Sequence, residues 1–245
     1  MIEITNLHKS FFGIDVLKGI DLTIPTGEFM VIIGLSGCGK SLLLKHLIGL
    51  EFADQGQVKI AGLELLNQNK RLKDVRQHVS ILFQNGALFD SLTVLDNVTF
   101  GLIETRLLKE PAARKQALES LSLVGLEANI DSYPYELSGG MRKRVAMARA
   151  IAVKPKYILY DEPTSGLDPV TTNSMNQLMV QLSQTLKITS IAVTHDMQSA
   201  QAIATRMAFL NDGRMAWQGV PSEALKSNCE PLKHFIQGIQ EPIKK

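Results

Sequence analysis

A glycine-rich segment that ends in lysine and serine carries the clearest chemistry in the sequence. Residues 34–41 fit the spacing G-x-x-x-x-G-K-[ST], between an apolar run at residues 29–33 and a helix-forming run at residues 42–48. Glycines let successive backbone N–H groups point at an anion, and the N-terminus of the next helix adds partial positive charge. A glycine-rich turn without a ligand is the alternative, but the flanking strand and helix favour a phosphate site.

Nucleotide phosphates are therefore expected at this loop. We expect Lys40 to reach the β- and γ-phosphates, and the Ser41 hydroxyl to bind Mg²⁺. The predicted nucleotide-binding residues are Gly34, Leu35, Ser36, Gly37, Cys38, Gly39, Lys40 and Ser41.

Two consecutive carboxylates, Asp161 and Glu162, follow the apolar run at residues 157–160. Ligands of an open parallel sheet bind beyond the carboxyl ends of its strands, so we expect both side chains to face the phosphate loop. Adjacent residues of a strand point to opposite faces, which predicts different roles for the two. Asp161 suits Mg²⁺, and Glu162 suits the attacking water. The alternative is that they cap the turn-rich segment at residues 163–166.

The elements that must position these residues alternate between strands and helices, which predicts an α/β fold with a largely parallel sheet. Continuous apolar runs at residues 29–33, 79–83, 157–160 and 190–193 indicate buried strands. Alternating runs at residues 2–5, 21–24 and 57–60 indicate antiparallel strands, and the turn at residues 211–213 predicts a terminal hairpin. Residues 90–152 are rich in helix formers and predict a helical insertion, with one helix over residues 110–126.

Composition excludes several classes of protein. The chain has 245 residues with a formal charge of +2, which gives no global field for nucleic acid or an anionic bilayer. Two cysteines cannot form a disulfide framework, so we expect a reducing compartment. We expect neither a secretory signal nor a membrane span, because no basic segment precedes an apolar one at the start and no window approaches 18 apolar residues.

A second helix N-terminus is predicted at residues 137–141. Ser138 suits an N-cap, Gly139 and Gly140 expose the backbone, and a helix follows to Ala152. This is a second anion-accepting site, and we do not expect one compact chain to bring both sites onto a single phosphate. An ordinary capped helix is the alternative.

Together, the phosphate loop, the carboxylates and the sequence Leu-Ser-Gly-Gly at residues 137–140 resemble the ATP-binding subunits of ABC transporters over essentially the whole chain. The resemblance implies a P-loop NTPase (RecA-like) core with an antiparallel β subdomain and a helical insertion subdomain. The expected domain is 1–236, with its core at about 1–86 and 153–225, its helical subdomain at about 87–152, and a loose tail at 237–245.

The resemblance also implies an ATPase that works as a dimer on integral-membrane permease subunits, with ATP and Mg²⁺ as cofactors. The signature of each copy completes the ATP site of the other, and Gln84 touches Mg²⁺ or its water and faces the membrane partner. His195 contacts the γ-phosphate, and Phe11, or alternatively Phe12, stacks on adenine. The implied catalytic residues are Glu162, His195 and Gln84; the metal residues are Ser41, Gln84 and Asp161; the signature is Leu137, Ser138, Gly139 and Gly140; and the interface-crossing D-loop is Ser165, Gly166, Leu167 and Asp168.

A narrower resemblance concerns the cargo. Residues 83–94, together with Met141 where most of the family has glutamine, resemble the ATPases of the Mla (maintenance of lipid asymmetry) phospholipid transporters. This implies a permease, an MCE lipid-binding protein, no nucleic acid, and a peripheral location on the cytoplasmic face of the inner (plasma) membrane. The alternatives are an importer ATPase for a small polar solute, a soluble ABC ATPase that acts on DNA or ribosomes, and a nucleotide-binding module without turnover.

Overall fold

Apolar runs of the sequence form strands that are buried on both faces. The computed structural model describes residues 1–65, 72–105 and 107–239. These fall into two compact units, a first unit of Met1–Arg76 with Thr189–Lys245 and a second unit of Gln77–Ile188. In the first unit, β3 (Phe29–Ile33) is buried at every residue and pairs in parallel with β8 (Thr189–Thr194) and β9 (Arg206–Asn211). The predicted parallel arrangement is confirmed for these strands.

The terminal hairpin is confirmed as well. β10 (Arg214–Gly219) pairs with β9 in the antiparallel direction. Asp212 and Gly213 between them both have positive φ, 45° and 73°, as a two-residue hairpin turn requires. The backbone N–H of Lys18 donates to the Gly213 carbonyl, which ties this turn to β2 (Ile14–Ile24).

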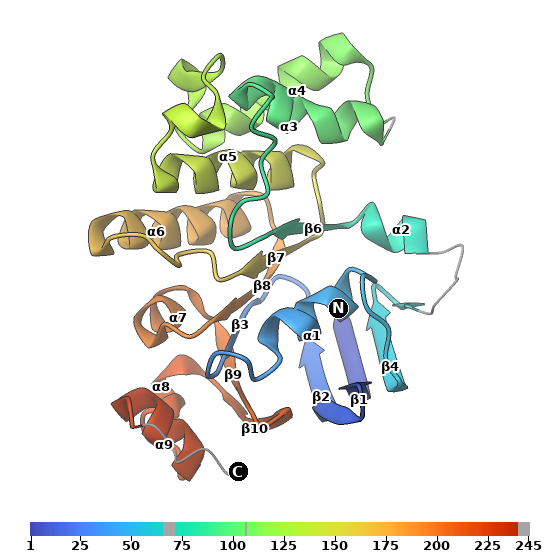
Figure 1. Cartoon of the computed structure of the whole chain (residues 1–245), viewed down its shortest axis with the longest axis vertical. Coiled ribbons are helices and arrows are strands. Elements are labelled where there is room, and N and C mark those ends of the chain that lie inside the picture. Colours follow the sequence, from blue (N-terminus) through green and yellow to red (C-terminus); the bar gives the residue numbers. More distant parts are fainter. Residues whose placement is uncertain (66–71, 106, 240–245) are drawn as a thin grey trace. The chain divides into compact units, whose positions relative to one another are not determined.

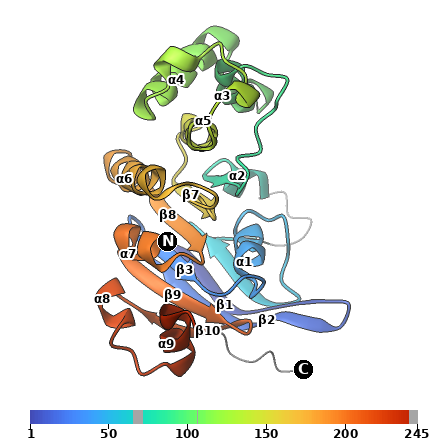
Figure 2. The same ribbon diagram turned by 60° about the vertical axis from the view of Figure 1, so that its left-hand side comes forward.

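An antiparallel sheet forms the rest of the first unit. Its strand order is β2-β1-β4-β5, with β1 at Ile2–Phe11, β4 at Gln55–Ile60 and β5 at Leu63–Glu64. Figure 2 shows the long pairing of β1 with β2. Ile2, Ile4 and Leu7 are buried whereas Glu3 and Thr5 are not, which is the alternation that marked these strands in the sequence.

The helices of the first unit are short. α1 (Lys40–Leu47) contacts β8, and α7 (Met197–Ile203) contacts β3 (Figure 1). The other helices are α2 (Leu72–Arg76), α8 (Pro221–Ala224) and α9 (Glu230–Gln237). Most of the predicted loose tail, residues 240–245, lies outside the described residues.

The second unit is mainly helical. β6 (Val79–Leu82) and β7 (Tyr157–Asp161) pair in parallel. α5 (Gly139–Ala152) contacts α3 (Val94–Glu104), α4 (Glu110–Leu123) and α6 (Pro169–Thr185), as both Figure 1 and Figure 2 show. Single turns of 3₁₀ helix at Glu127–Asn129 and Pro134–Glu136 lead into α5. The helix that begins with the signature glycines is therefore the central helix of this unit.

Candidate active site

The loop between β3 and α1 is curled by glycine. Gly37 and Gly39 have φ of 82° and 106°, in the left-handed region that favours glycine. A side chain at Gly34 would overlap the carbonyl oxygen of Leu210, so this position is closed by the neighbouring strand β9. Leu35 and Ser36 are exposed, so the turn of the loop is open to solvent.

Lys40 is held inside the curve of this loop. Its side chain is only 6% exposed, and Nζ donates to the carbonyl oxygens of Gly34 at 2.9 Å and Leu35 at 3.0 Å. Gly39 is the N-cap of α1, and a Cβ atom there would lie 2.9 Å from the Leu17 side chain of β2. The ammonium group and the helix N-terminus are thus positioned by packing before any anion binds.

His195 lies at the same strand edge as the phosphate loop. Ile33, the last residue of β3, pairs with Thr194, the last residue of β8. Gly34 and His195 therefore leave neighbouring parallel strands at the same end, where ligands of such sheets bind. The turn after His195 is fixed because Asp196 donates its N–H to the Thr194 hydroxyl at 3.0 Å and caps α7 through the Gln198 N–H at 2.9 Å.

The two aromatic candidates for adenine stacking differ in their surroundings. Phe11 is 37% exposed, and the Lys9 ammonium lies 5.2 Å from the centre of its ring. Phe12 is fully exposed, with φ of 51° in the turn between β1 and β2. Phe12 remains a candidate beside Phe11, because the Lys9 ammonium already occupies one face of the Phe11 ring.

In the second unit, one cavity brings three predicted motifs together. Its volume is about 340 Å³, and the residues that line it are Gln84, Asn85, Gly139, Arg142, Lys143, Ser165, Gly166 and Leu167. The Gln84 amide Nε2 donates to the Ser165 hydroxyl at 3.3 Å. Gln84 and Asn85, called the glutamine loop below, are therefore neighbours of the first signature glycine and of most of the predicted D-loop in a single chain.

Asp161 and Glu162 are distinguished by backbone conformation. The sequence pattern predicts that both residues are part of a strand with alternating side chains. This is wrong for Glu162, because β7 ends at Asp161. Glu162 has φ of 47°, a left-handed conformation that is uncommon outside glycine and that clusters at functional sites. Its carbonyl accepts the Ser165 N–H at 3.2 Å, which closes the turn.

The signature glycines meet different demands. Ser138 caps α5, its hydroxyl accepting the Met141 N–H at 3.3 Å. A Cβ atom at Gly140 would lie 2.6 Å from the Thr171 methyl group, so close packing of α5 against α6 requires this glycine. At Gly139 the nearest contact of a Cβ atom would be an ordinary 3.7 Å, to Leu167. Packing within the described chain does not explain the glycine at 139.

Asp168 of the predicted D-loop also has a structural role, as a helix cap. Its carboxylate accepts the N–H groups of Val170 and Thr171, each at 3.0 Å, and so caps α6. Hydrogen bonds from the Thr171 hydroxyl and these N–H groups hold the pKa of Asp168 below its usual value. The D-loop is thereby anchored to α6.

Comparisons with known proteins show the family of this chain. The family described as ABC transporter matches residues 17–165. The glutamine transport ATP-binding protein GlnQ of Escherichia coli is 41% identical over 98% of this chain and 100% of its own length. This chain belongs to the ABC transporter family. It is an ABC-type ATPase, the ATP-binding subunit of a transporter.

Further similar proteins fit the same family. The probable ribonucleotide transport ATP-binding protein mkl of Mycobacterium bovis is 40% identical over 97% of this chain, which spans 66% of that protein. The dimeric ATP-binding cassette MJ0796, in a post-hydrolysis state bound to ADP and Pi, superposes with a TM-score of 0.82 at 33% identity, over 90% of this chain and 99% of that one. CbiO1 of Clostridium perfringens superposes with a TM-score of 0.85 at 30% identity, over 96% and 94% of the two chains. The fold expected from the sequence, an α/β ABC ATPase with a helical subdomain, is confirmed.

The structure shows, at the cavity of the second unit, a buried lysine to which no role was assigned from the sequence. Lys143 of α5 is only 7% exposed and donates to the carbonyl oxygens of Ser165 at 2.6 Å and Glu162 at 3.4 Å. Burial lowers the pKa of Lys143 to about 8, and the Glu162 carboxylate opposes that shift. The sequence did indicate that Lys143 is buried, because it lies one helical turn before the apolar Met147, on the buried face of α5.

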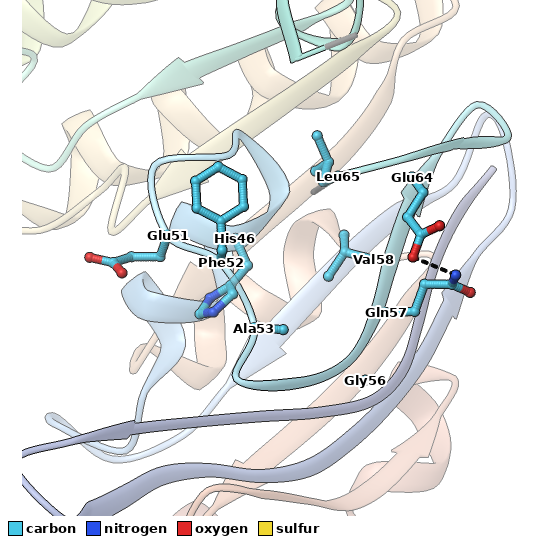
Figure 3. Close-up of a pocket in the computed structure, with 9 residues that line it drawn as sticks. All are labelled: His46, Glu51, Phe52, Ala53, Gly56, Gln57, Val58, Glu64 and Leu65. Carbon is cyan, nitrogen blue, oxygen red and sulfur yellow. Dashed lines mark hydrogen bonds between the residues drawn. The ribbon is translucent and has the colours of Figure 1, made fainter. Parts of the chain in front are cut away.

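A cavity of about 380 Å³ in the first unit involves none of the predicted residues (Figure 3). His46, which is buried on α1, lines it, and its Nδ1 donates to the Leu42 carbonyl at 2.8 Å. Burial lowers the pKa of His46, which favours the neutral ring. This cavity is lined from the end of α1 opposite to the phosphate loop, so it is not part of the nucleotide site.

Replacing Lys40 tests the phosphate loop. We expect Lys40→Ala to weaken binding of ATP by roughly 10- to 100-fold, because hydrogen bonds to charged groups contribute about 1.5–3 kcal/mol. Isothermal titration with ATP measures the change. Lys45→Ala, an exposed lysine of the same helix, is the control and should bind as the unaltered chain does. An unchanged affinity in Lys40→Ala contradicts this assignment of the loop.

Proposed function

We propose that two copies of this chain bind two Mg·ATP at a shared face and drive phospholipid transport through an integral permease. Glu162 orients water for in-line attack on the γ-phosphate. Lys40, His195 and the N-terminus of the partner copy's α5 stabilise the charge that develops on the phosphoryl oxygens. Loss of the γ-phosphate removes what holds the copies together, so they separate.

The proposed metal residues fit Mg²⁺ by their donor chemistry. Ser41, Gln84 and Asp161 offer a hydroxyl, an amide and a carboxylate oxygen, and Mg²⁺ prefers oxygen ligands. Gln84 uses its amide N–H₂ on Ser165, which leaves the amide oxygen as its ligand atom. When bound, Mg²⁺ would neutralise charge on the β- and γ-phosphates.

Pairing of two copies is supported by Gly139. The glycine is not required by packing within the described residues, and Ser138 beside it is exposed at the N-terminus of α5. Glycine is also used where backbone must approach a ligand closely, and helix N-termini bind phosphate. The dimeric form of the similar cassette MJ0796 is consistent with a partner's nucleotide as that ligand.

Coupling to the permease is supported by the segment after Gln84. The Arg149 guanidinium of α5 donates to the carbonyl oxygens of Gly86 and Ala87, each at 2.7 Å, so this segment is fastened to the signature helix. Phe89 and Phe100 pack with ring centres 4.8 Å apart, yet remain 45% and 40% exposed. An apolar permease segment that covers these rings could move α5 through Arg149.

The lipid cargo depends on a single observation, the sequence of residues 83–94 with Met141, which resembles the Mla-type ATPases. The proposed partners are therefore a phospholipid permease and an MCE lipid-binding protein, and the proposed location is the cytoplasmic face of the inner membrane. Among the residues that the structure describes, no helix has the length and apolar character needed to cross a membrane.

A small polar solute is the second candidate cargo. The similar proteins include the glutamine transport protein GlnQ, the probable amino-acid import protein YxeO of Bacillus subtilis, and the methionine import protein MetN of Carboxydothermus hydrogenoformans. These names favour an importer, whereas residues 83–94 favour a lipid transporter.

Glu162→Gln tests the proposed chemistry. The substitution keeps the shape of the side chain but removes the carboxylate that orients water. We expect ATP affinity to be retained, turnover to fall by at least about 100-fold, and a stable ATP-bound dimer to accumulate. Steady-state hydrolysis, ATP titration and size-exclusion chromatography with Mg·ATP measure these three quantities. Full turnover in Glu162→Gln would remove Glu162 from this role.

Purification of the complex in detergent tests the cargo. We expect the tagged chain to bring down an integral permease and phospholipid, identified by mass spectrometry. Phe89→Asp, which places a charge on the proposed docking surface, should lose the permease while it still binds ATP. A permease whose transport is stimulated by an amino acid, without bound phospholipid, would instead establish the second cargo.

A further inference from the structure

Glu162 holds its proposed place at a conformational cost. Its φ of 47° lies in the left-handed region, and such strain persists only where surrounding contacts fix it. The residue follows directly on β7, so a relaxed backbone at 162 would turn the carboxylate in another direction. The contacts that fix this backbone therefore govern where the carboxylate points.

Lys143 supplies the side-chain contacts to this turn. Its Nζ donates to the carbonyl of Glu162 at 3.4 Å and to that of Ser165 at 2.6 Å, across the same turn that the Ser165 N–H closes onto Glu162. Lys143 is only 7% exposed, so little water competes for its ammonium. The short bond to Ser165 is the strong charge-assisted one, and the contact to Glu162 is longer.

Ser165 extends the same set of contacts to Gln84. The serine hydroxyl accepts from the Gln84 amide at 3.3 Å, while the serine carbonyl accepts from Lys143. Lys143 and Ser165 also line the cavity that Gly139 borders. One lysine of the signature helix is thus connected to the proposed water-orienting residue, the D-loop and the glutamine loop.

We propose that Lys143 is a positioning residue for ATP hydrolysis. It fixes the left-handed turn at Glu162 and so directs the Glu162 carboxylate. The inference rests on the role of Glu162 in the proposed function. Movement of α5 is transmitted to Glu162 through this ammonium. The signature helix therefore controls turnover through the Glu162 of its own chain, in addition to binding the partner's nucleotide.

Substitutions of Lys143 in the full chain test the inference. Lys143→Met keeps an unbranched side chain but removes the donors, and we expect kcat for ATP to fall by about 10- to 100-fold, as when groups that orient a reacting ligand are lost. KM and ATP affinity should stay unchanged. Lys143→Arg keeps both charge and donors and should recover most of kcat. Lys156→Met, an exposed lysine of the same unit, is the control.

Lys143→Gln covers the case in which Lys143→Met does not fold. Its amide is neutral and one bond shorter, so kcat should fall whereas Lys143→Arg retains it. The inference is overturned if kcat survives in Lys143→Met or Lys143→Gln, or if Lys143→Arg folds and binds ATP but recovers nothing.

Combining Lys143→Met with Glu162→Gln separates this inference from the proposed function. If Lys143 acts through Glu162, the double variant turns over ATP in single-turnover assays no more slowly than Glu162→Gln alone. A further multiplicative loss contradicts the positioning role while leaving Glu162 in place. Wild-type turnover in Glu162→Gln alone contradicts the proposed function itself.

Discussion

The negative charge of a triphosphate must be met by N–H groups that are already in place, and we propose that this chain uses two helix N-termini for that purpose. The first N–H groups of a helix have no partner within the helix, so they are available to an anion. α1 begins at Lys40, and α5 begins at Gly139. We propose that the two meet at one nucleotide across a pair of copies.

The first of these sites is organised by packing. Lys40 is buried against the carbonyls of its own loop, β9 leaves no space for a side chain at Gly34, and a Cβ atom at Gly39 would crowd the Leu17 side chain of β2. His195 joins the loop because β3 and β8 run in register to the same edge. A loop that is organised by its own packing needs less reorganisation when an anion binds, which favours electrostatic stabilisation.

The second site depends on cations of α5 that bind backbone oxygens. Lys143 holds the turn at Glu162, Arg149 holds the segment at Gly86 and Ala87, and Arg144 donates to the Val124 carbonyl at 3.0 Å. The bonds of Lys143 and Arg149 join the helix to the parts that are proposed to orient water and to receive the permease, and the bond of Arg144 joins it to the end of α4. A displacement of α5 would therefore change the geometry of these contacts.

Much of the fold and of the candidate site could be predicted from local sequence patterns. The apolar run at residues 29–33, the Asp-Gly turn at 212–213 and the serine cap at 138 each leave a signature within a few neighbouring residues. The helix expected to reach residue 126 ends at Leu123, because Gly125 adopts φ of 70° just beyond it.

The remainder depended on contacts between distant residues. The left-handed Glu162 could not be predicted, because its conformation is tied to Ser165 and to Lys143, which lies on another element. The contact of Thr171 with Gly140 is likewise a matter of how α5 and α6 pack.

The direct test of the central claim is to mix two inactive variants. Lys40→Ala disables the phosphate loop, and Ser138→Arg disables the signature, so neither variant alone should hydrolyse ATP. If the signature acts across the pair, mixed dimers contain one site with both defects and one intact site. Turnover should then return to about a quarter of the wild-type rate when equal amounts are mixed, since about half of randomly formed dimers are mixed. Absence of any recovery, with mixed dimers present, would contradict the account.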